Sequence, residues 1–164
     1  NGADLVLIPI YYTPAAAILQ QAAGMGYAPT FFGVDGMDGL LSIDGFDTAL
    51  AEGVYMLTPF DANATDEMTV NFVTKYVELY GDTPNQFAAD AYDAMYIIAQ
   101  ACEELGITAD TSYEEACEML IPWMQQATYS GLTGQNMTWD ENGQVSKEVT
   151  AVVIRDGQYA SVNG

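Results

Sequence analysis

The stretch DLVLIPIYYTPAAAILQQAAGMGYAPTFFGVDG, residues 4–36, decides the fold of this chain. It has no charged side chain between its first and last aspartates, and its Pro and Gly residues stand where secondary-structure elements should begin and end. The apolar run over residues 4–8 predicts a fully buried strand. Thr13 and Pro14 predict a helix start for AAAILQQAA, and TFFGV over residues 30–34 predicts the next strand. Strand, helix and strand with short links are typical of a parallel, right-handed crossover unit, so the sequence predicts an α/β fold.

Polar and aromatic side chains follow the carboxyl ends of both predicted strands. Tyr11 and Tyr12 come just after the first strand, and Asp35 comes just after the second. Ligands of open α/β sheets bind outside the carboxyl ends of the strands, so this spacing predicts two aromatic rings and a carboxylate on one ligand-binding rim. The same spacing also fits a loop in which Asp35 is solvated and both tyrosines pack. Spacing alone leaves these two alternatives open.

The composition excludes several classes of function. The 164 residues are enough for one ordinary domain with a core. The chain has 23 acidic against 3 basic residues, a formal net charge of −20, which argues against nucleic acid or an anionic membrane surface as a partner. It contains no histidine, so we expect no His-dependent catalysis.

Two short motifs resemble ligand-binding signatures but lack required residues. Gly24-Met-Gly26 resembles part of a dinucleotide-binding fingerprint, but it ends a helix instead of starting one and Pro29 replaces the last glycine. The segment 61–72 begins like a calcium loop but lacks the turn glycine and the final glutamate. We therefore expect no cofactor, no metal and no enzymatic activity. An α/β enzyme domain of the Rossmann type stays an alternative.

The rest of the chain predicts helices followed by a hairpin. Asp66 or the residue before it should cap one helix, Asn85 should open the next, and Ser112 forms a capping box with the glutamate three residues on. The Asp-Gly pair at residues 156–157 predicts a hairpin turn. The helix after Asn85 has an apolar stripe that predicts its core face: Phe87, Ala88, Ala91, Tyr92, Met95, Ile98, Ala99 and Cys102.

The two cysteines, Cys102 and Cys117, fall on successive predicted helices. In an exported protein they could form a disulfide, and they could equally be two buried free thiols. The sequence leaves both alternatives open.

Five segments in order carry a resemblance to a known family. The segments are GADLVLIPIYY, PTFFGVDGMD, EGVYMLTPF, YVELYGDTPNQFAADAYDAMY and YSGLTGQNMTWDENGQ. Together they resemble the carboxyl-terminal half of an ABC-transporter solute-binding protein of the leucine/isoleucine/valine-binding family. The resemblance implies a parallel-sheet lobe of a class I periplasmic-binding-protein fold, with helices and a β-hairpin that belong to the partner lobe.

The resemblance also implies a division of the chain between two lobes. Residues 1–84 would form the second-lobe βαβ core, residues 85–146 the crossover helices and hairpin of the first lobe, and residues 147–164 the return to the second lobe. The segment that builds the first lobe would be missing upstream, so the chain would be a fragment. Uncovered apolar faces and sheet edges then predict self-association or a companion chain.

The function implied is the binding of a small amino-acid-like solute for an ABC permease. Asp35 would hold the ligand's ammonium group and Tyr11 would offer its hydroxyl and ring, with Tyr12 nearby. Phe87 and Met37 would form an apolar wall, with Phe87 facing the cleft from the helix start. The protein would be extracytoplasmic and bacterial, in the periplasm or as a cell-surface lipoprotein, and would bind a branched-chain or related amino acid. A ligand-sensing ectodomain of a signalling receptor shares the fold and stays an alternative.

Overall fold

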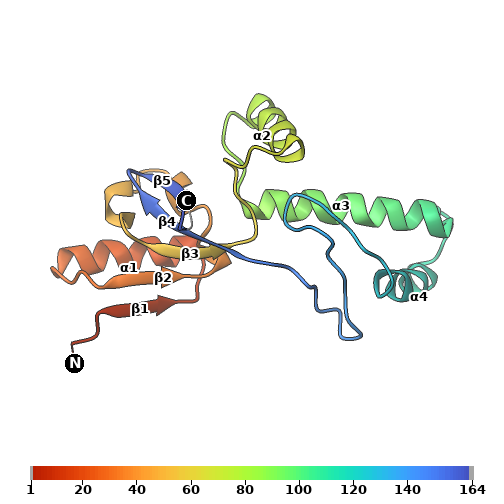
Figure 1. The fold of residues 1–164 in the computed structure, drawn as a ribbon, viewed down its shortest axis with the longest axis horizontal. Coiled ribbons are helices and arrows are strands. Elements are labelled where there is room, and N and C mark those ends of the chain that lie inside the picture. Colours follow the sequence, from red (N-terminus) through yellow and green to blue (C-terminus); the bar gives the residue numbers. More distant parts are fainter. Residues whose placement is uncertain (1, 163–164) are drawn as a thin grey trace. The chain divides into compact units, whose positions relative to one another are not determined.

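The computed structural model describes residues 2–162 (Figure 1), and the chain divides into two compact units. Unit 1 comprises Asn1–Pro59 and Val149–Gly164, and unit 2 comprises Phe60–Glu148. The assignment of the ranges 1–84, 85–146 and 147–164 to two receptor lobes stays a prediction.

Unit 1 is built on a five-stranded sheet in the order β1-β2-β3-β4-β5 (Figure 1). The first two strands pair in parallel, as do the second and third, while the fourth and fifth are antiparallel to their neighbours. The predicted parallel strand–helix–strand unit and the α/β class are therefore confirmed. The strands are β1 (Leu5–Ile8), β2 (Thr30–Gly33), β3 (Tyr55–Thr58), β4 (Thr150–Arg155) and β5 (Gln158–Ser161).

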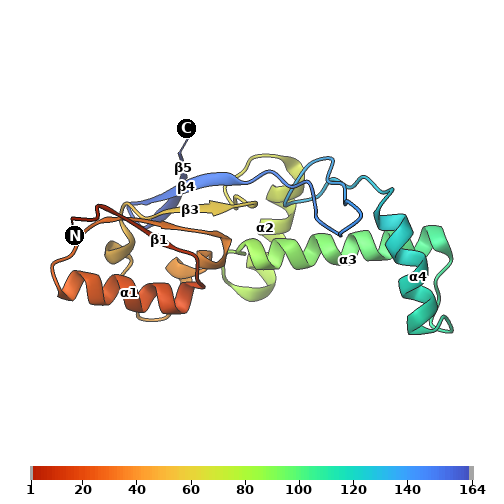
Figure 2. The same ribbon diagram turned by 90° about the horizontal axis from the view of Figure 1, so that it is seen from below.

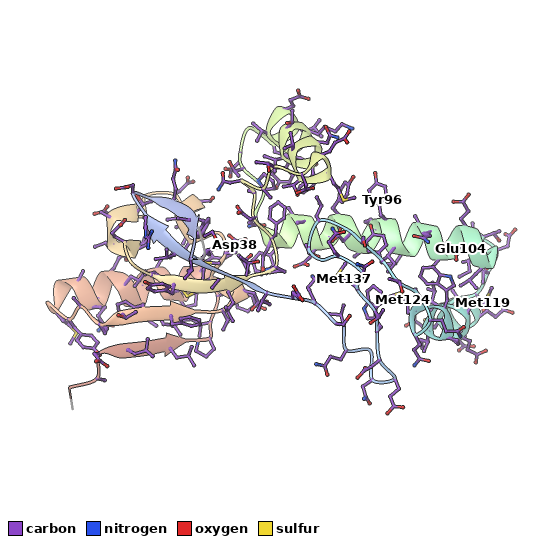
Figure 3. All side chains as sticks on the ribbon, viewed as in Figure 1. Asp38, Tyr96, Glu104, Met119, Met124 and Met137 are labelled. Carbon is purple, nitrogen blue, oxygen red and sulfur yellow. The ribbon has the colours of Figure 1, made fainter. Side chains whose placement is uncertain are left out.

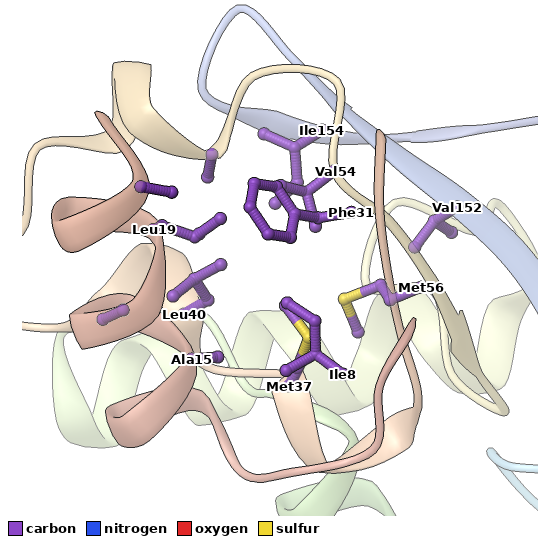
Figure 4. Packing of buried hydrophobic residues seen from close by; sticks show 13 residues of the cluster. Ile8, Ala15, Leu19, Phe31, Met37, Leu40, Val54, Met56, Val152 and Ile154 are labelled. Carbon is purple, nitrogen blue, oxygen red and sulfur yellow. The ribbon is translucent and has the colours of Figure 1, made fainter. Parts of the chain in front are cut away.

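One face of this sheet packs against helix α1 (Tyr12–Gly24) and three short 3-10 helices, η1 (Asp35–Met37), η2 (Leu40–Ser42) and η3 (Thr48–Ala51). Figure 4 shows the core between them, where Leu19 of α1 approaches Phe31 and Ile154 of the sheet. The other labelled members of this core are Ile8, Ala15, Met37, Leu40, Val54, Met56 and Val152.

Helix α1 begins earlier than the sequence predicts. Tyr11 is its N-cap residue and makes no side-chain capping bond, so the predicted cap at Thr13 is wrong. Pro14 is the third helical residue. The first four N–H groups of a helix have no partner within the helix, so a proline in this turn removes no helical hydrogen bond.

The prediction of a fully buried first strand is also wrong. Leu5 and Leu7 of β1 are 58 % and 61 % exposed, whereas Ile8 is buried. Successive side chains of a strand point to opposite faces, so Ile8 enters the core beneath α1 and Leu7 lies on the opposite face. A strand is buried throughout only when both faces of its sheet are covered, and Figure 2 shows α1 on one side of this sheet.

Unit 2 contains three helices and an extended return segment. The helices are α2 (Glu67–Tyr80), α3 (Gln86–Leu105) and α4 (Tyr113–Met124). The predicted caps at Asp66, Asn85 and Ser112 are confirmed, because each side chain accepts a hydrogen bond from a first-turn N–H. In the return segment, residues 129 and 137 form an isolated β-bridge, as do residues 139 and 145.

Helix α3 holds the return segment through a buried carboxylate. Asp93 is 4 % exposed and accepts hydrogen bonds from the Leu132 N–H at 2.9 Å, the Thr133 N–H at 2.9 Å and the Thr133 hydroxyl at 2.8 Å. A Cβ atom at Gly131 would overlap the Asp93 carboxylate, so this close approach requires a glycine. One turn earlier, Asp90 forms an ion pair of 2.7 Å with Lys147.

The buried face of α3 differs from the predicted apolar stripe. Met95 and Ile98 of that stripe are exposed, and the buried residues of α3 are Gln86, Ala89, Asp93, Ile97 and Ala101. Apolar periodicity assigns a charged residue such as Asp93 to the surface. Asp93 is instead buried, because three donors from Leu132 and Thr133 in a distant loop satisfy its carboxylate.

Two further features concern the cysteines and the apolar character of the helices. Cys102 and Cys117 are free thiols, so the structure favours that alternative over the disulfide. Among residues 2–162, no helix combines the length and apolar character needed to cross a membrane.

Candidate functional site

The parallel pairing of β1 with β2 creates the rim on which the predicted site residues stand. Ile8 pairs with Gly33, so the segments that follow both strands leave the sheet at the same edge. Tyr11 lies at the N-terminus of α1 and is 66 % exposed. Asp35 is the first residue of η1 and is also exposed. Both side chains are therefore open to solvent on the carboxyl edge of the sheet.

The loops that carry these two residues touch each other at Gly36. A Cβ atom placed on Gly36 would lie 3.1 Å from the Ile10 carbonyl oxygen and 3.4 Å from Cδ1 of Tyr11. The Tyr11 ring thus lies against the backbone of the residue next to Asp35. The structure brings Tyr11 and the Asp35 loop together, as the predicted rim requires.

Met37 and Tyr12 take different positions from those the sequence predicts. Met37 is 0 % exposed and lies in the unit 1 core, so its side chain has no surface through which to contact a ligand. Gly33 makes this possible, because a Cβ atom there would overlap the Met37 sulfur. Tyr12 is half-buried in the first turn of α1 and packs against the same core. We therefore assign Met37 and Tyr12 to the support of the rim instead of its surface.

Phe87 belongs to unit 2, where it is the second residue of α3 and is exposed. Tyr11 and Asp35 belong to unit 1. That Phe87 faces Tyr11 and Asp35 across a cleft between the two units stays a prediction.

A second carboxylate of the η1 region turns inward. Asp38, labelled in Figure 3, is buried, and one of its carboxylate oxygens accepts a hydrogen bond of 2.9 Å from the Gly39 N–H. Burial and the charge of Asp38 raise the pKa of Tyr159, a residue of β5, well above its usual range. Sequence reasoning missed this contact, because nothing near Asp38 in the sequence identifies a tyrosine from the carboxyl-terminal hairpin as its neighbour.

A hollow of about 220 Å³ between α3 and the end of α4 offers another polar surface. Its lining includes Glu104 (Figure 3), whose two carboxylate oxygens accept hydrogen bonds from Trp123 Nε1 at 2.7 Å and Gln100 Nε2 at 2.9 Å. The same two bonds, with Gln100 the larger cause, lower the pKa of Glu104. Because the carboxylate is already bonded at both oxygens and exposed, this hollow is a weaker candidate than the rim.

The described part of the chain does not assemble a metal site. Within residues 2–162 there is no group of three or more His, Cys, Asp or Glu side chains that could hold an ion. The rim itself carries the exposed Asp35 carboxylate and, against the neighbouring Gly36, the Tyr11 ring.

Comparisons with known proteins identify the family and the fold of the chain. The sequence profile of a family described as periplasmic binding protein matches residues 1–158. No curated protein matches the chain.

Solved structures match nearly the whole chain. The leucine-binding protein LivK from Thermotoga maritima is 27 % identical with a TM-score of 0.76, and the match covers 96 % of this chain. A putative branched-chain amino acid ABC transporter from Rhodospirillum rubrum is 27 % identical with a TM-score of 0.66 over 97 % of this chain. The LivJ substrate-binding protein from Streptococcus pneumoniae, in complex with isoleucine, shares the fold with a TM-score of 0.78 at 24 % identity over 96 % of this chain. The chain spans 43 %, 44 % and 43 % of these three proteins, respectively, so it corresponds to less than half of each.

Proposed function

Because the chain belongs to the periplasmic binding protein family, we propose that it forms the ammonium-binding part of a bacterial receptor for a small amino acid. Proteins of this family bind solutes and are not enzymes, and the chain has the α/β lobe of the class I fold. The observation that carries the proposal is the exposure of Asp35 and Tyr11 on one carboxyl edge of the sheet.

The rim suits a primary amine. A carboxylate that accepts hydrogen bonds from an ammonium group contributes on the order of 1.5–3 kcal/mol net. The Tyr11 ring is within reach of the same region, where it adds a hydroxyl for hydrogen bonding and a π-face for the cation. An acid without an amine would be repelled by Asp35. The leucine-binding and isoleucine-bound relatives support an aliphatic amino acid as the ligand class.

The remaining parts of the site complete the proposal. Phe87 would provide an apolar wall from the other unit, and the receptor's remaining chain would bind the ligand carboxylate. Closure around the ligand would exclude water and strengthen the polar contacts. The receptor would work outside the cytoplasm, in the periplasm or as a lipid-anchored protein at the cell surface. It would deliver the amino acid to an ABC permease.

The test compares Asp35 with an aspartate on the opposite edge of the sheet. L-isoleucine and L-leucine are titrated by calorimetry into a polypeptide of the relatives' length that contains this chain. We expect Asp35→Asn to weaken binding by about 10- to 150-fold, the equivalent of 1.5–3 kcal/mol. The control is Asp4→Asn, because Asp4 is exposed just before β1, at the amino edge of the same sheet. Unchanged affinity in Asp35→Asn would refute the assignment, as would equal binding of 4-methylpentanoate, which lacks the amine.

A further inference from the structure

The run 33-GVDGM-37 contains two glycines that leave room for two different neighbours. At Gly33 the missing side chain admits the sulfur of Met37, which lies in the unit 1 core. This contact fixes η1 to the end of β2 from the core side. Neither glycine has a positive φ, so each is required for space and not for an unusual backbone conformation.

At Gly36 the missing side chain admits the loop between β1 and α1. The atoms nearest to an added Cβ would be the Ile10 carbonyl oxygen at 3.1 Å, Cδ1 of Tyr11 at 3.4 Å and the Ile10 carbonyl carbon at 3.5 Å. The first of these distances is tighter than nine in ten real Cβ contacts. Because the nearest atom belongs to the backbone just before α1, it cannot rotate away, and the two loops would have to separate.

We infer that Gly36 is the positioning residue of the proposed amine site, which it serves by holding the Tyr11 ring against the backbone that carries Asp35. This inference rests on the proposed function. Gly33 fixes the Asp35 loop from the core side, and Gly36 fixes the spacing to Tyr11 from the rim side. A methyl group at position 36 moves the loop of Ile10 and Tyr11 away by a few tenths of an ångström, so the Tyr11 ring contacts an ammonium group held by Asp35 less closely.

A series of three Gly→Ala variants tests the inference in the chain itself. Gly36→Ala should keep the fold but change the NMR signals of the Tyr11 ring and of the Ile10 backbone, against which the new methyl group would lie. Gly24→Ala is the matched control, because a Cβ there meets no atom within 4 Å, and it should leave those signals unchanged. Gly33→Ala should instead lower the Tm of the whole unit, since its Cβ overlaps Met37.

Binding is then compared in the longer polypeptide used for Asp35. Gly36→Ala should weaken L-isoleucine binding about tenfold with a smaller loss of Tm than Gly33→Ala, while Gly24→Ala binds as the parent does. The inference is overturned if the parent chain shows no contact between Tyr11 and Gly36, or if Gly36→Ala binds normally. It is equally overturned if Gly36→Ala lowers the Tm as much as Gly33→Ala, which would make Gly36 a core residue. If the parent polypeptide does not bind L-isoleucine although Tyr11 contacts Gly36, the proposed function is refuted. The role of Gly36 in setting the distance between Tyr11 and the Asp35 loop is then retained.

Discussion

Two aspartates three residues apart show how much a single residue's role depends on distant parts of the chain. The position of Asp35 after a strand predicts its place at the rim, because the strand end is a local feature of the sequence. Asp38 has the same residue type, yet it is buried near Tyr159 of β5. Met37 is similar, since its burial depends on the space above Gly33. Local spacing thus predicts the positions of Tyr11 and Asp35 at the carboxyl edge of the sheet. The positions of Asp38 and Met37 depend on burial, which local spacing does not reveal.

Tyr159 should make the protein lose stability in alkali. Its pKa is raised in the folded protein, mainly by burial and secondarily by Asp38, so the unfolded chain releases this proton first. The stabilisation is complete below pH 10 and falls as the pH rises above 10, by up to about 1.4 kcal/mol per pH unit. Urea unfolding between pH 8 and pH 11 should show this loss, and Tyr159→Phe should reduce the slope. Tyr80→Phe, at an exposed position, is the control, and an equal slope in Tyr159→Phe would contradict the assignment.

Asp93 and Asp90 of α3 allow the stability contribution of a buried carboxylate to be compared with that of a partly exposed one. Asp93→Ala leaves the N–H groups of Leu132 and Thr133 buried without their acceptor, so we expect a loss of about 3 kcal/mol in the free energy of unfolding of unit 2. Asp90→Ala removes a partly exposed ion pair with Lys147 and should cost less than about 1 kcal/mol. Urea titrations followed by the fluorescence of the two tryptophans, both in unit 2, measure the difference. Equal losses in the two variants would show that Asp93 does not hold the return segment.

At the scale of elements, the sequence predicts where helices and strands begin better than which face they bury. The caps at Asn85 and Ser112 and the hairpin turn at residues 156–157 depend on neighbouring residues, and the structure has all three. The buried face of α3 depends on Asp93 and its distant donors, so apolar periodicity selects the wrong side. The exposure of Leu7 likewise depends on what covers the second face of the sheet.

Helix α2 offers a test of capping in acid. The side chain of Asp66 accepts a hydrogen bond of 3.0 Å from the Thr69 N–H, and the bonds to Thr69 lower the pKa of Asp66. The stabilisation is therefore present above the usual aspartate pKa of about 4 and is lost as the pH falls below it. Asp66→Ala should cost about 1 kcal/mol at pH 7 and less at pH 3, by urea unfolding. Asp66→Asn keeps an acceptor and should retain most of the stability; if it costs as much as Asp66→Ala, the cap is not the cause.

At the scale of the whole molecule, the net charge of −20 opposes the compact state. The chain has only three basic side chains, and the ion pair between Lys147 and Asp90 uses one of them. Salt screens repulsion between the many exposed carboxylates. We therefore expect the Tm to rise when sodium chloride increases from 0.02 M to 1 M. Sodium chloride tests this better than sulfate, because sulfate also strengthens apolar burial; a Tm that is constant or falls would contradict the prediction.

The same salt should also promote association through the second face of the unit 1 sheet. One cross-strand row on this face consists of Leu7, Phe32, Tyr55, Val153 and Ala160. Val153 is buried within this row, whereas Leu7 on the edge strand β1 is 61 % exposed. Exposed edges and apolar patches favour pairing with another chain, whereas the like charges of two copies oppose it. We expect light scattering to show association that increases with protein and salt concentration, unless a companion chain covers the face.

A charge on this face should prevent the association without disturbing the core. Leu7→Lys places a cation on the edge strand at a side chain that is already 61 % exposed, so the fold should persist while the scattering falls to that of a monomer. Leu79→Lys, at a leucine of α2 that is 74 % exposed, controls for the change in net charge and should leave the association intact. If the parent chain stays monomeric at high salt and high concentration, the uncovered face is not an interface. If both variants reduce scattering equally, the loss of any exposed leucine, and not this face of the sheet, explains the change.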